Sequence, residues 1–136
     1  MRTTMLALVL AMSGALAQAA ASVNEGRIDY IELPATNMAR VKAFYTQVFG
    51  WSFTDYGGSY SAFKDGRLAG GFSTDMKPIT GGGPMVIIYS ANLAGMRAKV
   101  LQAGGAVTRD IYTFPGGKRF HFKDPSGNEL SVWSDK

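Results

Sequence analysis

The residues best suited to chemistry lie near the C-terminal end of the chain, in the stretch RFHFKDPSGNELSVW from Arg119 to Trp133. This stretch contains the only histidine of the protein, His121, followed eight positions later by an acid, Glu129. An imidazole and a carboxylate can act as acid and base on a small ligand, and they can also contribute to a metal site. His121 and Glu129 are therefore the candidate catalytic residues.

The segment DPSGN predicts a turn between two antiparallel strands, because Pro125 presets its backbone angle and Gly127 accepts a positive φ. The expected cross-strand pairs are Lys123 with Glu129, His121 with Ser131, and Arg119 with Trp133. These six side chains then share one face of the sheet, and the other face carries Phe120, Phe122, Leu130 and Val132. A slip of one residue would mix polar and apolar side chains on both faces, so the pattern favours this register.

Two simpler interpretations of this hairpin remain open. The polar face could be a solvated surface with a cross-strand ion pair between Lys123 and Glu129, contributing under about 1 kcal/mol. His121 could also be a structural residue, hydrogen-bonded inside the fold, because a lone histidine is more often structural than catalytic.

The rest of the chain predicts two similar α/β units. IDYIEL and MVIIYS are strand-like, and each precedes an amphipathic segment. The first helix is expected near 38–49, behind a cap at Thr36 or Asn37 and before Gly50; the second is expected near 93–103, behind Asn92 and before Gly104. Each unit then ends in a hairpin with the tripeptide Phe-Lys-Asp, at 63–65 and at 122–124.

This repetition predicts an α+β domain that spans residues 26–136 and contains two βαβββ modules, at about 26–73 and 84–136. The modules are separated by the Gly- and Pro-containing joint STDMKPITGGGP. We expect eight short strands. With 136 residues, the chain is long enough for one such domain and too short for two ordinary ones.

The sequence resembles the vicinal oxygen chelate superfamily, also called the glyoxalase, bleomycin resistance protein and extradiol dioxygenase family. The matching stretches are IDYIELPATNMARVKAFYTQVFGW, LQAGGAV and FKDPSGNELSVW. The resemblance implies that two βαβββ modules form a half-open barrel around the active site. It does not specify a reaction, because the family includes isomerases, epimerases, dioxygenases, thiol transferases and drug-binding proteins.

Metal-dependent members of that family bind one divalent ion through His, Gln and Glu side chains. By the resemblance, the corresponding positions here are Tyr30, about Met85, Ser131 and one residue within Leu68-Ala69-Gly70-Gly71. Phenol, thioether and hydroxyl groups lack the imidazole and carboxylate donors that give such ions affinity. We therefore expect no metal and no other cofactor.

The first 20 residues are typical of a signal peptide: Arg2 precedes an apolar run from Met5 to Leu16, followed by small residues in A-x-A spacing. The apolar run is too short for a retained membrane anchor, which needs roughly 20 residues. The protein is thus expected to be periplasmic or secreted, without stable membrane insertion after cleavage. Removing Arg2 leaves 13 basic residues against 10 acids, and their scatter argues against a nucleic-acid partner. The absence of cysteine excludes disulfides.

The favoured function is metal-free binding of a small, partly aromatic or anionic molecule by a protein expected to be a homodimer. The predicted ligand-binding residues are Tyr30, Glu32, Tyr60, Arg119, His121, Glu129, Ser131 and Trp133. Aromatic rings would supply stacking surface, while Arg119 and His121 orient a carboxylate or hydroxyl. The segment FPGGKR, residues 114–119, is a candidate lid because of its paired glycines.

Two other functions remain possible. The protein could be a metal-independent lyase or isomerase, similar to the lactoylglutathione lyase-like family, that uses His121 and Glu129 on a small oxygenated metabolite. A glyoxalase reaction is the least expected version, because the usual mechanism needs an ion to polarise the substrate. The protein could also be an interaction module with a vestigial pocket.

Overall fold

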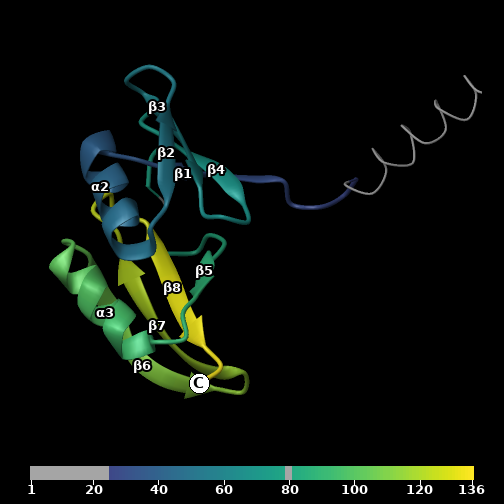
Figure 1. Ribbon diagram of the computed structural model, residues 1–136, viewed down its shortest axis with the longest axis vertical. Coiled ribbons are helices and arrows are strands. Elements are labelled where there is room, and N and C mark those ends of the chain that lie inside the picture. The colour runs from purple at the N-terminus through teal and green to yellow at the C-terminus, as the bar shows by residue number, and fades with distance from the viewer. Residues whose placement is uncertain (1–24, 79–80) are drawn as a thin grey trace, which may run out of the picture.

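The computed structural model describes residues 25–78 and 81–136, which form two similar halves around one core (Figure 1). The first half contains β1 (Tyr30–Pro34), α2 (Met38–Phe49), β2 (Ser52–Asp55), β3 (Tyr60–Lys64) and β4 (Ala69–Ser73). The second contains β5 (Ile87–Tyr89), α3 (Leu93–Gln102), β6 (Ala106–Phe114), β7 (Gly117–Lys123) and β8 (Glu129–Ser134). The predicted α+β class and the two βαβββ modules are confirmed. The predicted signal peptide lies outside the described residues.

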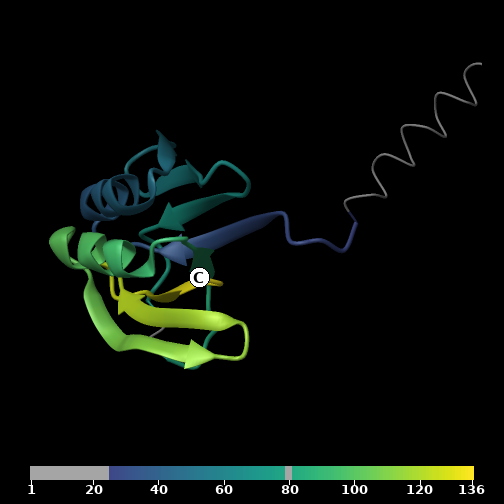
Figure 2. The ribbon, with the colours of Figure 1, turned by 60° about the horizontal axis from the view of Figure 1, so that its bottom comes forward.

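Each module contributes one four-stranded sheet, in the orders β1-β4-β3-β2 and β5-β8-β7-β6. The first strand of each module runs parallel to the last, and the other neighbours are antiparallel. Figure 2 shows the two helices on one side of the molecule, with the sheets above and below. Each sheet therefore has one face toward the helices and one face away from them, which we call its open face.

Both helices begin where their capping residues predict, and the first also ends there. The side chain of Asn37 accepts a hydrogen bond from the backbone N–H of Arg40 at 3.0 Å, and Asn92 does the same for Gly95. Gly50 ends α2 with a left-handed φ of 72°. The second helix ends at Gln102, one residue before the expected end. Neither helix in the described part of the chain has the length and apolar character needed to cross a membrane.

The core joins both modules through aromatic side chains. Tyr45 of α2 stacks on Trp51 with ring centroids 4.6 Å apart, and Trp51 stacks on Phe63 at 4.4 Å. Phe120 and Phe122 of β7 are fully buried in the same cluster. A continuous aromatic core of this kind fixes the two sheets relative to each other.

The DPSGN turn of the second module is attached to the first module by buried hydrogen bonds. Asp124 accepts a 2.9 Å bond from the Tyr45 hydroxyl, and Asn128 donates a 2.7 Å bond to the carbonyl of Pro34. Ser126 accepts a bond from the backbone N–H of Thr36. Burial raises the pKa of the Asp124 carboxyl, although its hydrogen bonds from Asn128 and Tyr45 act in the opposite direction. The turn is therefore part of the joint between modules.

Candidate functional site

The C-terminal hairpin has the register predicted from the sequence. Lys123 pairs with Glu129, His121 with Ser131, and Arg119 with Trp133. The apolar side chains Phe120, Phe122, Leu130 and Val132 are buried against the core. The chemical groups of the hairpin are consequently carried by the open face of the second sheet.

His121 and Glu129 lie side by side across β7 and β8. Nδ1 of the imidazole lies 3.5 Å from Oε1 of Glu129, and the side chains are 13% and 27% exposed. An ionised carboxylate can only accept hydrogen bonds, so the position of Glu129 favours the neutral His121 tautomer that carries its proton on Nδ1. The ion pairs within the described residues do not include the alternative pair of Lys123 and Glu129.

The other nitrogen of His121 contacts a residue that the sequence analysis did not identify. Nε2 lies 2.9 Å from the hydroxyl of Tyr112, on the neighbouring strand β6. The Nε–H of Arg119 donates to the same hydroxyl, and the guanidinium of Arg109 lies 3.5 Å from the centre of the Tyr112 ring. Glu129, His121, Tyr112 and Arg119 thus form a chain of polar contacts across three strands, which we call the second-module cluster.

A smaller cluster occupies the open face of the first sheet. The hydroxyls of Tyr30 and Tyr60 are 2.7 Å apart, and Tyr60 donates to Glu32 at 2.9 Å. Loss of solvent around the Tyr60 hydroxyl and its bonds to Tyr30 and Glu32 raise its pKa strongly. Gly71 leaves the space for this arrangement, because a Cβ there would lie 2.1 Å from the Tyr60 oxygen. We call these residues the first-module cluster.

A pocket of about 290 Å³ is lined by residues of both modules and of the joint that connects them. Glu32 of the first cluster and Glu129 of the second both line it, together with Lys77, Met76 and Met85. The pocket has walls from β1, from the segment before β5 and from the start of β8. Two of the eight predicted ligand-binding residues, Glu32 and Glu129, are therefore brought together from opposite ends of the sequence, whereas the other six do not line this pocket.

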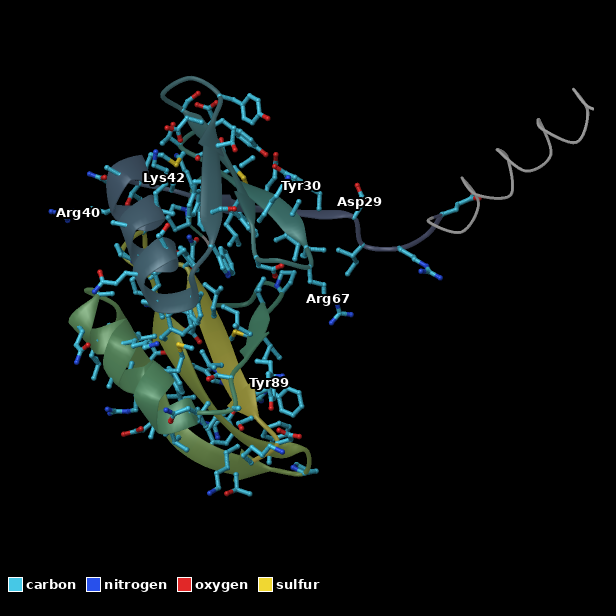
Figure 3. The ribbon with its side chains drawn as sticks, viewed as in Figure 1. Asp29, Tyr30, Arg40, Lys42, Arg67 and Tyr89 are labelled. Atoms are coloured by element: carbon cyan, nitrogen blue, oxygen red, sulfur yellow. The ribbon has the colours of Figure 1, made fainter. Side chains whose placement is uncertain are left out.

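The remaining predicted site residues have different surroundings. Ser131 is fully buried and donates its hydroxyl proton to the carbonyl of Phe120, so that proton is already satisfied. Trp133 packs edge-on against Tyr89, with ring centroids 5.4 Å apart. Figure 3 shows Tyr30 and Tyr89 on the side of the molecule away from the helices.

The lid expected at 114–119 is wrong. Phe114 pairs with Gly117 across a two-residue turn, and Lys118 and Arg119 belong to β7. Gly117 is required there, because it has a φ of 149° and a Cβ would lie 2.1 Å from the carbonyl oxygen of Ser134. The paired glycines thus form a tight hairpin between two strands and leave no loop to move.

The positions that hold the family's metal have unsuitable surroundings. Tyr30 is bonded to Tyr60, the Ser131 hydroxyl to a carbonyl, and Met85 is a thioether at the pocket wall. Within residues 25–78 and 81–136, no three His, Cys, Asp or Glu side chains lie close enough together to hold an ion.

Comparison with protein families identifies the family of this chain. Residues 27–132 match the model of the "Glyoxalase/Bleomycin resistance protein/Dioxygenase superfamily". The chain belongs to this superfamily. The match includes both clusters and the joint between the modules.

Individual relatives are more distant. The chain is 28% identical over 122 residues to "Putative glyoxylase CFP32" of Mycobacterium tuberculosis and of Mycobacterium bovis, covering 80% of this chain and 46% of each relative. It thus spans about half the length of these curated relatives.

Solved structures of superfamily members share the fold. A family enzyme from Burkholderia phytofirmans has a TM-score of 0.69 at 15% identity, covering 80% of this chain and 100% of the other. Lactoylglutathione lyase from Agrobacterium tumefaciens has a TM-score of 0.62 at 20% identity, covering 80% and 93%.

Proposed function

We propose that this superfamily member is an exported, metal-free protein that binds a small organic ligand between its two modules. The observation that carries the proposal is the pocket of about 290 Å³, lined by Glu32 from one module and Glu129 from the other. Its volume is near the lower end of the range for small-molecule sites. Glu32 accepts a hydrogen bond from Tyr60, and Glu129 lies 3.5 Å from the imidazole of His121, so both carboxylates have neighbours that position them before a ligand arrives.

The proposed independence from metal rests on the donor groups at the family's ligand positions. Phenol, thioether and hydroxyl groups give first-row divalent ions little affinity, and the Ser131 hydroxyl already donates to Phe120. Metal analysis of protein purified without a polyhistidine tag should give well under one equivalent of Zn, Ni, Mn or Fe. A stoichiometric ion whose removal lowers the melting temperature would contradict this.

A thermal-shift screen tests ligand binding directly. Mature protein is heated with a library of small organic acids, alcohols and amines, because a ligand that binds the folded state raises the apparent melting temperature. A compound that stabilises the native protein should stabilise Glu129→Gln less. Lys64→Gln, which changes an exposed charge in the other module, is the matched control. Equal shifts in all three proteins would place binding elsewhere.

Export is supported by the N-terminal sequence pattern. Mass spectrometry of protein recovered from the periplasm or the medium should show a new N-terminus between Gln18 and Ser22. Full-length protein retained in the cytoplasm would contradict the proposed location.

A homodimer is supported by exposed apolar side chains near the open side of the molecule. Ile28, Ile87 and Tyr89 are 79%, 46% and 50% exposed. Burying such side chains against a second copy would be favourable. Light scattering on the purified protein should give twice the chain mass, and a monomer at high protein concentration would exclude this assembly.

The alternative is a lyase or isomerase that acts on a small oxygenated metabolite. It is favoured by the closeness of His121 and Glu129, because a carboxylate beside an imidazole can orient it for acid–base catalysis. The name of the mycobacterial relatives describes a glyoxylase, and one structural neighbour is a lactoylglutathione lyase. Compounds that raise the melting temperature should be incubated with the protein and followed by proton NMR. Turnover that is lost in His121→Gln would support the enzyme, and unchanged compounds would support the binding protein.

A further inference from the structure

A β-bulge in β6 determines which side chains meet His121. Arg109 lies opposite His121, and Tyr112 lies opposite Arg119. Two residues separate Arg109 from Tyr112 on β6, whereas only one separates His121 from Arg119 on β7, so β6 contains one extra residue. In a regular strand, residues three apart point to opposite faces. The extra residue instead puts Arg109 and Tyr112 on the same face, where the guanidinium of Arg109 stacks on the Tyr112 ring.

The bulge is held from the other side by the second helix. Arg97 of α3 donates two hydrogen bonds to the carboxylate of Asp110, at 2.9 and 3.0 Å. The same carboxylate accepts from the backbone N–H of Ile111 at 2.7 Å, inside the bulge. A bidentate pair of this kind fixes direction as well as distance. Asp110 and Arg97 are thus well placed to position Tyr112.

The Tyr112 hydroxyl is held by its neighbours on both sides. It accepts from Arg119 and lies 2.9 Å from Nε2 of His121, which acts as acceptor when the proton is on Nδ1. A phenol has two acceptor lone pairs, so one remains for a ligand hydroxyl. An oxygen oriented by two partners can recognise such a group with little loss of entropy.

Positive charge and aromatic surface lie beside this oxygen. The ion pairs among the described residues include neither Arg109 nor Arg119. The Arg119 guanidinium lies 5.2 Å from the centre of the Phe114 ring, which packs edge-on against Trp133. Arginines without a carboxylate partner beside aromatic rings suit an aromatic carboxylate.

We propose that Tyr112 contacts the ligand, that the bulge held by Arg97 and Asp110 aims it, and that the ligand is a small aromatic carboxylate with a hydroxyl group. This ligand class rests on the proposed function, because it takes the open face of the second sheet as part of the binding site. The positioning of Tyr112 is a property of the unliganded protein and can be tested separately.

The first experiment uses the single histidine as a reporter. In ¹⁵N NMR spectra of the full mature protein, the two imidazole signals belong to His121 alone. Tyr112→Phe and Asp110→Ala should both shift the Nε2 signal toward the value of an imidazole without a hydrogen-bond donor. Asp55→Ala breaks the comparable helix-to-strand pair with Lys42 in the first module and should leave the signals unchanged. An Asp110→Ala spectrum identical to wild type would overturn the positioning role.

The second experiment uses mandelate and phenylacetate, which share a ring and a carboxylate and differ in the hydroxyl group. By calorimetry, the native protein should bind mandelate about tenfold more tightly, as expected for one added hydrogen bond. The preference should disappear in Tyr112→Phe and in Asp110→Ala, and persist in Asp55→Ala. Equal binding of both acids to the native protein would overturn the proposed role of Tyr112 but would leave the proposed function intact. A protein that binds neither acid nor any library compound would overturn the proposed function and this ligand class with it.

Discussion

The two modules end in hairpins that begin alike and are used differently. Asp65 and Asp124 follow the same Phe-Lys pair, and each accepts hydrogen bonds from backbone N–H groups two and three or four residues later. Asp65 is exposed, whereas Asp124 is 4% exposed and bonded to Tyr45. The same local turn is therefore a surface feature in one module and part of the joint in the other.

The open faces of the two hairpins also differ at matching positions. Lys64 pairs with Ala69 as Lys123 pairs with Glu129, so Ala62, Ala69 and Gly71 correspond to His121, Glu129 and Ser131. Small residues in the first module leave room for Tyr60 to lie over the sheet. Larger polar residues at the matching positions in the second module, His121 and Glu129, belong to the second-module cluster. Duplicated backbone geometry thus supports one aromatic and one ionisable surface.

The largest expected effect distinguishes the two turns. Asp124→Ala should lower the free energy of unfolding by about 3 to 4 kcal/mol, because it leaves the Tyr45 hydroxyl and the N–H groups of Ser126 and Asn128 without their acceptor in a buried site. Asp65→Ala should cost much less, because water can replace its acceptor. Urea unfolding of the two variants measures the difference. Equal losses of unfolding free energy in the two variants would show that the contacts of Asp124 with the first module do not stabilise the protein.

The next effect tests the close packing of the first sheet. A Cβ at Gly70 would lie 2.3 Å from the carbonyl oxygen of Ile31 and 2.2 Å from the Phe63 ring, so Gly70→Ala should destabilise the protein by about 2 to 3 kcal/mol. Gly58→Ala meets no atom within 4 Å and should change stability by less than about 1 kcal/mol. Thermal melts of both variants compare them. A neutral Gly70→Ala would mean that β1 and β4 are not held in this pairing.

The pH dependence of stability gives a smaller effect with a definite sign. Burial raises the pKa of Asp124 in the folded state. At pH values between the usual carboxyl pKa and this raised pKa, the folded state therefore binds more protons than the unfolded state. The contribution of Asp124 to the unfolding free energy should therefore fall as the pH rises through that interval, from about pH 4 upward.

Asp124→Asn removes this titration. In urea melts, the difference in unfolding free energy between wild type and the variant should decrease as the pH rises and then stay constant. A difference that increases with pH would mean that the hydrogen bonds to the carboxylate outweigh its burial.

The smallest expected change in stability is at His121. His121→Gln keeps hydrogen-bonding capacity, and the polar contacts of the imidazole are with Tyr112 and Glu129 on the open face, so stability should change by less than about 1 kcal/mol. Affinity for a ligand found by screening should fall several-fold. Lys123→Gln, on the same strand face, is the control and should leave affinity nearly unchanged. A large loss of stability with intact binding would make His121 a structural residue.

The fold could be predicted from the sequence because its signals are local. Asn37 and Gly50 define the ends of α2, and the turn at 124–128 with its alternating apolar residues fixes the register of β7 and β8. The first-strand residues Tyr30 and Glu32 could be placed on one face for the same reason, since side chains alternate along a strand. The lid was mispredicted because glycines alone do not distinguish a loop from a tight hairpin.

Local sequence patterns specify the two modules, the capped helices and the polar face that carries His121 and Glu129, because periodicity and turn chemistry act over a few residues. The contact between Tyr112 and His121 depends on tertiary structure, since the bulge in β6 places Tyr112 on the face that carries His121. Tertiary structure also decides that Glu32 and Glu129 share a pocket and that Asp124 is buried while Asp65 is exposed. These outcomes depend on how the modules pack, and packing brings together residues that no local pattern relates.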